Sequence, residues 1–133
     1  MDANVLLTAA YNPNGLAAAL ITRQKKFRIA VTISRYAVEE AEYNLSLKSS
    51  ESLPRFRELL TQIEVLDAPF PEGFNPLSLP ADDAPIFQAA LAAGATHLLT
   101  GDKKAFGSWM NKPSKTHGIV IQTVRQFFDD FSK

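Results

Sequence analysis

The sequence alternates longer segments of helical pattern with short apolar segments that are typical of buried strands. The clearest pair is "DDAPIFQAALAAG" at residues 82–94, followed by "THLLTG" at residues 96–101. The first segment has an acidic start, an early proline and a terminal glycine, which are the usual limits of a helix. Strands that alternate with helices favour right-handed crossovers and a mostly parallel sheet covered on both faces. The sequence therefore predicts a three-layer α/β/α fold with a mostly parallel central sheet.

The remaining elements follow the same alternation and suit a single domain over residues 1–133, a length that allows a substantial core. Asn14 and Ser34 are predicted helix caps. Residues 69–80 hold four prolines, which indicates an irregular connection. The other predicted elements are helices at residues 16–26, 34–47, 52–63 and 124–131, and strands at residues 27–32, 64–68 and 118–122.

Composition excludes several classes of function. The chain has no cysteine, which excludes disulfides, thiolate zinc sites and cysteine nucleophiles and fits a reducing cytoplasm. It has neither an apolar run of about 18 residues nor a basic start followed by an apolar stretch. We therefore expect a cytoplasmic protein with no membrane span. The formal net charge is zero, so nucleic-acid binding would need a local basic patch.

Four acidic residues stand at positions where a parallel α/β fold binds ligands, beyond the carboxyl ends of its strands. Asp102 directly follows a predicted strand, and Asp83 begins the helix that leads into it. Glu40 lies one to two turns into another helix, and Asp2 lies close to the first apolar run. Converging carboxylates of this kind repel one another and suit Mg²⁺ or Mn²⁺, which prefer oxygen ligands.

Each acid also has an ordinary structural interpretation. Asp83 before Ala-Pro is a common helix cap, and Asp102 is a common turn residue. Glu40 has acidic neighbours on its helix and by itself resembles a solvated side chain. The joint pattern is therefore more informative than any one of these acids.

Three segments together resemble the PIN-domain ribonucleases, especially the VapC-type toxins of toxin–antitoxin pairs. "DANVLLTAA" (residues 2–10) is similar to the opening motif of that family, and "SRYAVEEAEYNL" (residues 34–45) to its glutamate-bearing helix. "DAPIFQAALAAGATHLLTGDKKAF" (residues 83–106) resembles its longest motif, an Asp-led helix and a strand that ends in Thr-Gly-Asp. The resemblance extends over nearly the whole chain.

The resemblance implies a metal-dependent endoribonuclease that leaves a 5′-phosphate and a 3′-hydroxyl. It also implies an antitoxin protein as partner and allows a homodimer. The implied ligands of one or two Mg²⁺ or Mn²⁺ ions are Asp2, Glu40, Asp83 and Asp102, and the implied supporting residues that orient them are Asn4, Ser34 and Thr100.

Several side chains near the Thr-Gly-Asp segment are candidates for contact with RNA. Trp109 is predicted either to stack on a base or to pack, and Phe106 to pack the turn onto the core. The apolar faces of the helices at residues 16–26 and 52–63 are predicted to face the core or an interface. The candidate phosphate-binding residues are Arg35, Lys103 and Lys104, followed by Lys112 and Lys115.

Two features differ from the pattern of the family. Only Met1 precedes Asp2, where relatives have a first strand, so that strand either begins later or belongs to a truncated start. Ala105 stands where many relatives carry another acid. We therefore expect one tightly held ion, or none without substrate.

Three other functions remain as alternatives. A receiver domain is disfavoured, because Asp82 and Asp83 begin a late helix instead of following the first strand. A PIN-like binding module without catalysis, acting through protein or RNA partners, remains open, as does a nuclease that acts on DNA or structured substrates. The chain shows no Ser-His-acid arrangement around His97 or His117.

Overall fold

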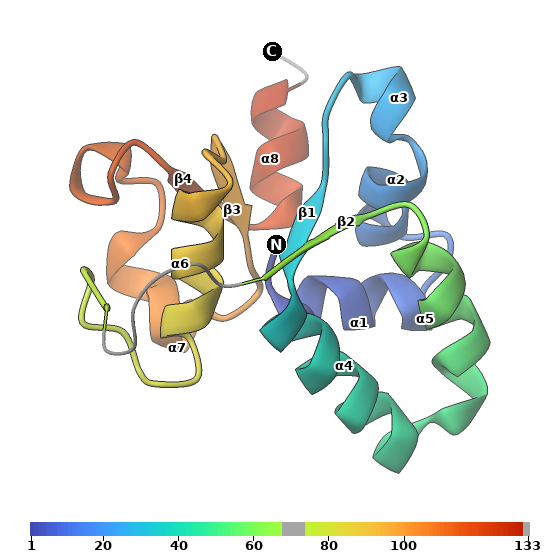
Figure 1. Cartoon of the computed structure of the whole chain (residues 1–133). Helices are drawn as coiled ribbons and strands as arrows, with labels where there is room; N and C mark the ends of the chain where they lie inside the picture. Colours follow the sequence, from blue (N-terminus) through green and yellow to red (C-terminus); the bar gives the residue numbers. More distant parts are fainter. Residues whose placement is uncertain (68–73, 132–133) are drawn as a thin grey trace.

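The structure is a computed structural model that describes residues 1–67 and 74–131 (Figure 1). None of its described helices has the length and apolar character needed to span a membrane. Short 3₁₀ turns occur at Ser50–Ser52, Gly107–Trp109 and Pro113–Lys115. The strands are β1 (Thr32–Ser34), β2 (Glu64–Leu66), β3 (His97–Leu99) and β4 (Val120–Gln122). The helices are α1 (Ala3–Tyr11), α2 (Leu16–Thr22), α3 (Gln24–Phe27), α4 (Arg35–Lys48), α5 (Leu53–Leu60), α6 (Ala84–Ala92), α7 (Lys103–Phe106) and α8 (Val124–Phe131).

The strands form two separate parallel pairs. Strand β1 pairs with β2, with Thr32 opposite Glu64, and β3 pairs with β4, with His97 opposite Val120. Among the described residues these pairs are two two-stranded sheets, not the single central sheet that the sequence predicts. The parallel pairing is confirmed, whereas the three-layer arrangement is not.

The first two residues lie between the two sheets. The Met1 ammonium donates to the Thr32 carbonyl at 2.8 Å, and the Asp2 N–H donates to the Leu99 carbonyl at 2.9 Å. Residues that follow Asp2 form α1, so the prediction that a first strand begins later in the chain is wrong. The reason is local, because the Asp2 carboxylate caps the helix by accepting from the Ala3 N–H at 2.7 Å.

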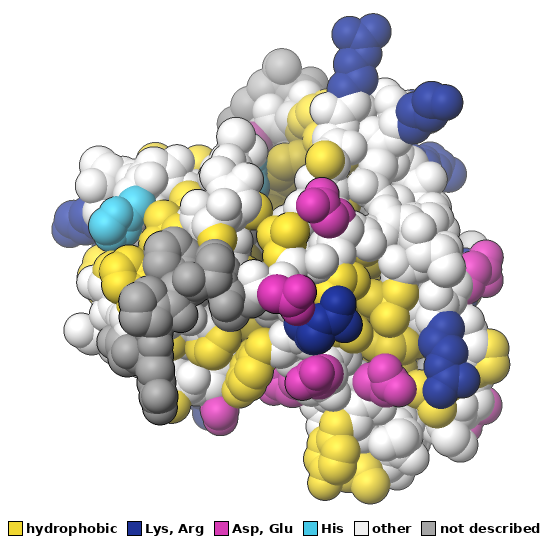
Figure 2. All heavy atoms as spheres, in the orientation of Figure 1, with side chains coloured by type: hydrophobic (Ala, Val, Ile, Leu, Met, Phe, Trp, Pro, Cys, Tyr) yellow, Lys and Arg dark blue, Asp and Glu magenta, His cyan; other side chains and the backbone are white. Residues whose placement is uncertain are grey.

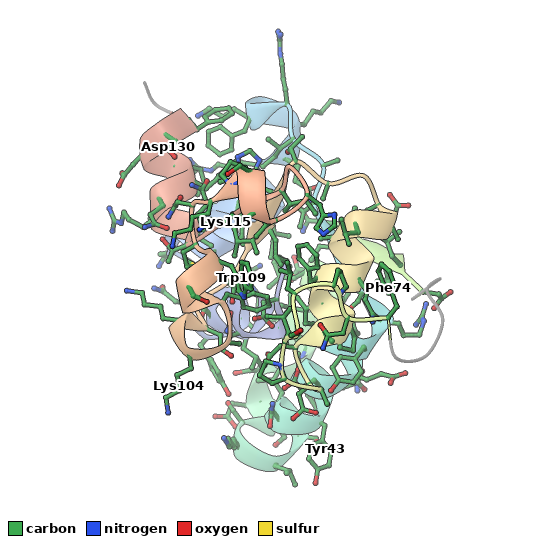
Figure 3. All side chains as sticks on the ribbon, turned by 90° about the vertical axis from the view of Figure 1, so that its left-hand side faces the viewer. Tyr43, Phe74, Lys104, Trp109, Lys115 and Asp130 are labelled. Carbon is green, nitrogen blue, oxygen red and sulfur yellow. The ribbon has the colours of Figure 1, made fainter. Side chains whose placement is uncertain are left out.

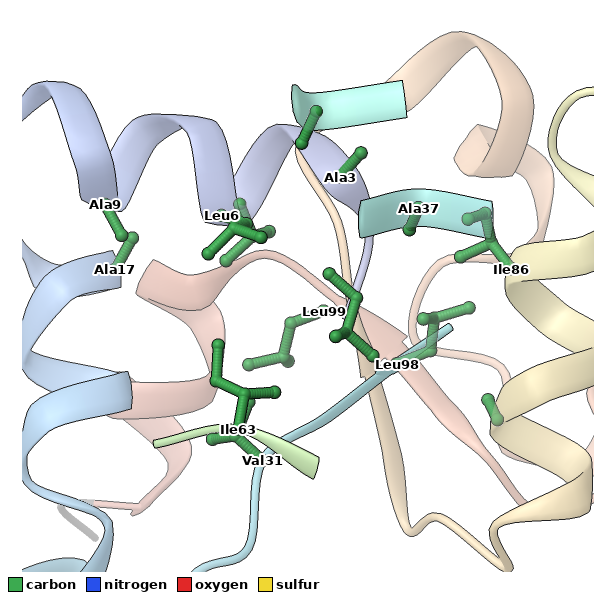
Figure 4. Packing of buried hydrophobic residues seen from close by; sticks show 14 of the residues in the cluster. Ala3, Leu6, Ala9, Ala17, Val31, Ala37, Ile63, Ile86, Leu98 and Leu99 are labelled. Atoms are coloured by element: carbon green, nitrogen blue, oxygen red, sulfur yellow. The ribbon is translucent and has the colours of Figure 1, made fainter. Parts of the chain in front are cut away.

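The buried side chains form one connected hydrophobic cluster. Its largest fully buried members are Phe56, Phe87 and Phe106, so the predicted packing of Phe106 is confirmed. Small residues let helices approach closely, as where Ala9 of α1 faces Ala17 of α2 (Figure 4). This core holds the strand ends and the helix starts in fixed relative positions.

The prediction from sequence differs most from the structure in the region from α2 to β1. The predicted helix at residues 16–26 is broken at Arg23 into α2 and α3, and the predicted strand at residues 27–32 is wrong because β1 begins only at Thr32. The side chain of Gln24 explains the break. Its amide nitrogen donates to the Ile21 carbonyl at 2.8 Å, and its amide oxygen accepts from the Val31 N–H at 2.8 Å. The same nitrogen donates to the distant Gln62 carbonyl at 2.6 Å, so bonds of one side chain override the helical pattern.

Elsewhere the predicted elements are displaced by a few residues or confirmed. The prediction for 124–131 is confirmed by α8, and the Ser34 cap is confirmed because its Oγ accepts from the Ala37 N–H at 3.0 Å. The Asn14 cap is wrong, since Gly15 occupies that position without a side-chain bond. Gly94 follows α6 with a positive φ of 64°, as a terminal glycine should. Residues 74–80 contain neither helix nor strand, whereas residues 68–73 lie outside the described part.

Candidate functional site

Asp2 and Asp102 meet through the hydroxyl of Thr100, where β3 ends and α1 begins. Asp2 is only 5% exposed, and its Oδ2 accepts from the Thr100 Oγ1 at 2.7 Å. The same hydroxyl oxygen accepts from the Asp102 N–H at 2.9 Å. The hydroxyl of Thr100 therefore fixes the side chain of one acid and the backbone of the other.

Asn4 provides a second connection between α1 and the end of β3. Its Oδ1 accepts from the Gly101 N–H at 3.0 Å, and its Nδ2 lies 3.5 Å from Asp2 Oδ2. Ser34 behaves differently, because its hydroxyl caps α4 by accepting from the Ala37 N–H and does not contact an acid in the described part of the chain. Of the three expected supporting residues, Asn4 and Thr100 contact Asp2, while Ser34 positions the helix that carries Glu40.

Asp102 caps the short helix that follows β3. Its Oδ1 accepts from the Lys104 N–H at 3.0 Å and from the Ala105 N–H at 3.1 Å. This capping role is a local structural reason for an aspartate to stand directly after a buried strand. It engages only one of the two carboxylate oxygens, so Oδ2 is left for another partner.

Asp83 occupies the N-cap position of α6, but its side chain makes no capping bond. The interpretation of its carboxylate as a simple helix cap is therefore wrong. Glu40 is exposed on α4. Within residues 1–67 and 74–131 the ion pairs are Arg35–Asp67 and Arg55–Glu58, so no basic side chain pairs with Asp83 or Glu40.

The pKa values indicate that these acids share one electrostatic neighbourhood. Burial raises the pKa of Asp2, to which the charge of Asp102 adds, although hydrogen bonds to its carboxylate oppose this. Although Glu40 is exposed, partial loss of water around its carboxylate raises its pKa, and the charges of Asp2, Asp82, Asp83 and Asp102 raise it further. The pKa of Asp83 is raised by burial first and then by Asp102, Asp2 and Asp82. The charges of neighbouring carboxylates therefore make Asp2, Glu40 and Asp83 harder to ionise.

Asp82 and Tyr36 belong to this neighbourhood but were not among the predicted site residues. The Tyr36 O–H donates to Asp82 Oδ1 at 3.2 Å, which connects α4 to the segment before α6. Burial raises the pKa of Tyr36, and the hydrogen bond to Asp82 raises it further. The adjacent acids Asp82 and Asp83 were the available signal in the sequence, whereas nothing there marks Tyr36.

The described acidic side chains do not surround a point at which a metal ion could be coordinated. In the described part of the chain no three acidic or histidine side chains are arranged to hold a metal ion. The donor chemistry nevertheless suits a hard cation, because the groups are carboxylates that repel one another and have no basic partner among residues 1–67 and 74–131. The predicted convergence is therefore partial, since the side chains interact electrostatically without forming a coordination shell.

The candidate RNA-binding residues differ in their surroundings. Lys103 and Lys104 are exposed on α7, and Lys104 extends away from the protein (Figure 3). Arg35 is already engaged, since its Nε lies 2.8 Å from Asp67 Oδ1. Trp109 is half-buried and packs against the core, which matches the packing interpretation. In Figure 2 acidic side chains gather over the region of α4, where nucleic acid would meet repulsion without a cation.

The two histidines lie in packed surroundings. His97 is half-buried, its Nδ1 lies 2.8 Å from the Thr96 Oγ1, and its ring meets that of Phe127 at 5.1 Å. Burial lowers the pKa of His97. His117 has a positive φ of 56° and lies beside Phe87. These contacts are structural and do not involve the acidic neighbourhood.

The fold and the site define an α/β protein with carboxylates gathered beyond the ends of parallel strands. The family model of the PIN domain matches residues 1–104, and the chain belongs to the PIN-domain family. The matched part includes all four predicted acids. No curated protein and no solved structure matches this chain. PIN domains are generally nucleases, so membership supports a nuclease-type role.

Proposed function

We propose that this protein is a metal-dependent endoribonuclease whose acids Asp2, Glu40, Asp83 and Asp102 hold Mg²⁺ or Mn²⁺. The main observation behind this proposal is that nearby carboxylates raise the pKa values of Asp2, Glu40 and Asp83 at one place, with no basic partner there among the described residues. Such a cluster costs stability unless a cation offsets the repulsion. Nuclease chemistry is also the general property of the family to which the chain belongs.

The four acids would have different parts in holding the ion. Asp2 is the rigid member, because both of its oxygens are already bonded by the protein. Asp102 offers its Oδ2, since only Oδ1 caps α7. Glu40 lies on α4 and Asp83 precedes α6. Neither carboxylate is in an ion pair within the described part of the chain, so both would turn toward the ion. A bound divalent cation would supply an activated water and stabilise the charge on the leaving oxygen.

The exposed side chains of Lys103 and Lys104 would offset the charge of RNA phosphates near Asp102. Cleavage would leave a 5′-phosphate and a 3′-hydroxyl. Ala105 contributes a backbone N–H to Asp102 but no carboxylate, so we expect one ion and not two. We further propose that the protein is the toxin of a toxin–antitoxin pair in the cytoplasm, with an antitoxin protein as partner and a surface that allows a homodimer.

A second candidate function is a PIN-like module that binds protein or RNA without cleaving it. The observation that favours it is the absence of a closed metal position among the described side chains. The two candidates differ in one measurable respect, since only the nuclease requires a divalent ion for its effect on RNA.

The test is cleavage of end-labelled single-stranded RNA in Mn²⁺, in Mg²⁺ and in chelator. The variants are Glu40→Gln and the matched control Glu39→Gln, whose residue is also exposed and lies next to Glu40 on α4. We expect metal-dependent cleavage by the wild type and the control, and loss of at least about a hundredfold in Glu40→Gln. Folded protein that binds RNA without cleaving it would favour the binding module. Equal cleavage by both variants would contradict the assigned role of Glu40.

A further inference from the structure

A groove of about 770 Å³ begins at the candidate site and extends along α1. Its lining includes Asn4, Thr100 and Gly101, the residues that join α1 to the end of β3 beside Asp2. The turn between α1 and α2 and the start of α8 form its other walls. Protein sites for small organic ligands commonly have volumes of about 300–1,000 Å³, so this groove has room for a nucleotide.

Polar side chains follow one face of α1 along this groove. Asn4, Thr8 and Asn12 are spaced four residues apart, which places them one above another on a helix. Thr8 and Asn12 are exposed, and the Thr8 hydroxyl bonds within the helix to the Asn4 carbonyl at 2.8 Å. Eight helical residues extend over about 12 Å, so this polar face leads well away from the acids.

The turn between α1 and α2 brings two side-chain amides to the far end of the groove. Asn12 lies so close to Gly15 that a Cβ at Gly15 would stand 2.8 Å from the Asn12 Nδ2. Asn12 and Asn14 are both exposed, and within residues 1–67 and 74–131 neither side-chain amide has a hydrogen-bond partner. An amide offers a donor and an acceptor side by side, which is the pattern that recognises the edge of a nucleic-acid base.

The charge of the groove suits a phosphate. Arg125, at the start of α8, belongs to the lining and is exposed. Neither ion pair of the described residues involves it. None of the described lining residues is acidic, although the groove begins beside Asp2. A guanidinium group binds phosphate oxygens through two parallel N–H donors, so the lining offers a phosphate one free cation without a competing carboxylate.

Apolar side chains from three helices complete the lining. Val5, Leu16 and Val124 come from α1, α2 and α8. None of the described lining residues is aromatic, so the face of a base would pack against aliphatic groups here instead of stacking on a ring. The groove therefore combines an apolar surface, free amides and one cation, which are the complements of a base and its phosphate.

We propose that this groove binds the nucleotide next to the scissile phosphate of a single-stranded RNA, with Arg125 on a phosphate and the amides of Asn12 and Asn14 at the base. The inference rests on the proposed nuclease function, because the acids define where the scissile phosphate lies. The groove supplies affinity and a preference for the bound base, whereas the acids and their ion carry out cleavage.

The test measures RNA binding separately from cleavage. Fluorescence anisotropy follows the full chain with a labelled ten-nucleotide RNA of alternating adenine and uracil, in chelator and at low salt. The variants are Arg125→Gln, the charge-conserving Arg125→Lys, and the matched control Arg57→Gln, whose residue is exposed on α5 and lies outside the lining. We expect Arg125→Gln to weaken binding by about tenfold, Arg125→Lys by less, and Arg57→Gln by no more than about twofold.

A second pair of variants adds the same charge inside and outside the groove. Thr8→Glu places a carboxylate in the lining. Thr22→Glu is its matched control, because Thr22 is exposed and its hydroxyl likewise bonds four residues back, to the Ala18 carbonyl at 2.9 Å. We expect Thr8→Glu to weaken RNA binding by about tenfold and Thr22→Glu by no more than about twofold, with circular dichroism confirming that both fold.

Cleavage by the same proteins in Mn²⁺ separates this inference from the proposed function. If both hold, Arg125→Gln should raise KM by about tenfold and leave kcat nearly unchanged, because the groove binds ground state and transition state alike. Groove-dependent binding without cleavage by folded wild type would support the groove as a nucleotide site and contradict only the nuclease proposal. Metal-dependent cleavage in which Arg125→Gln and Thr8→Glu behave like their controls would overturn the groove and leave the nuclease standing.

Two further results would overturn the inference. One is the lack of saturable RNA binding by folded wild type at protein concentrations up to about 0.1 mM. The other is a dimer in sedimentation that Thr8→Glu dissociates, without RNA binding, which would assign the groove to a second copy of the chain.

Discussion

At the scale of single residues, one hydroxyl organises the candidate site. Thr100 Oγ1 donates to the buried Asp2 carboxylate and accepts from the Asp102 backbone. The bond to Asp2 is buried, whereas the bond from Asp102 is partly buried. Asp2 is only 5% exposed, and the hydrogen bond to its carboxylate reduces the free-energy cost of burying that group.

Thr100→Val tests this dependence, because it keeps the shape of the side chain and removes both bonds. The Asp2 Oδ2 would lose its closest partner while remaining buried, so we expect the free energy of unfolding to fall by about 1–3 kcal/mol. Urea denaturation provides the measurement. Thr8→Val is the control, because the hydroxyl of Thr8 makes a solvent-exposed bond on α1. Equal effects of the two substitutions would contradict the role of Thr100.

Repulsion between the acids predicts a stabilising substitution in the protein without metal. The pKa of Asp83 is raised in the folded state, so protonation favours folding, and this contribution is lost as the pH rises through the raised pKa. Asp83→Asn removes the charge and breaks no capping bond. We expect the variant to melt at a higher temperature than the wild type at pH 7 in chelator, by about a few degrees. The difference should shrink as the pH falls below the range in which Asp83 is ionised.

Glu39→Gln is the control for that series, since Glu39 is not among the charges that raise the pKa of Asp83. It should leave the melting temperature nearly unchanged at every pH. A lower melting temperature for Asp83→Asn at neutral pH would mean that its carboxylate stabilises the fold, which would remove the argument for a cation.

At the scale of elements, local signals predicted most helices and failed where distant side chains decide. Residues 124–131 and the Ser34 cap follow from local pattern. The region before β1 does not, because Gln24 bonds to backbone groups of Ile21, Val31 and Gln62 that lie up to 38 positions away. Local sequence carries no information on such a contact.

The candidate site also contains residues that the sequence identified and residues that only distant contacts reveal. The three segments that resemble the family's motifs identified Asp2, Glu40, Asp83 and Asp102, and the charge of Asp102 raises the pKa values of the other three, which places the four in one neighbourhood. They did not identify Tyr36, whose bond to Asp82 joins residues 46 positions apart. They also did not foresee that Asp102 would use one oxygen as a helix cap, although its position before two lysines and an alanine allowed it.

Gln24→Ala tests the junction between α2, α3 and β1. It removes bonds to the Ile21 and Gln62 carbonyls and from the Val31 N–H, so we expect a loss of about 1–3 kcal/mol in unfolding free energy. Lys25→Ala is the matched control, because Lys25 is exposed on the same short helix. Chemical denaturation of both variants provides the comparison. A loss no larger than that of the control would show that the junction is held by packing alone.

At the scale of the whole molecule, two parallel strand pairs are held together by the first two residues and by one hydrophobic cluster. The candidate site lies where these parts meet, since Asp2 follows Met1 and its carboxylate is bonded to the end of β3. Any ligand of the acids would therefore also connect α1, α4, α6 and the end of β3. Metal binding is thus expected to stabilise the whole fold and not only the site.

Binding of Mn²⁺ tests the central claim most directly, because the nuclease proposal depends on the acids and a divalent ion. We would titrate Mn²⁺ into the protein at pH 7.5 and follow the free ion by electron paramagnetic resonance. Asp102→Asn is the informative variant, because asparagine keeps an oxygen to cap α7 while the charge is lost. The account predicts one site in the wild type, with affinity reduced by about tenfold or more in Asp102→Asn. No binding by folded wild type, or equal binding by the variant, would contradict it.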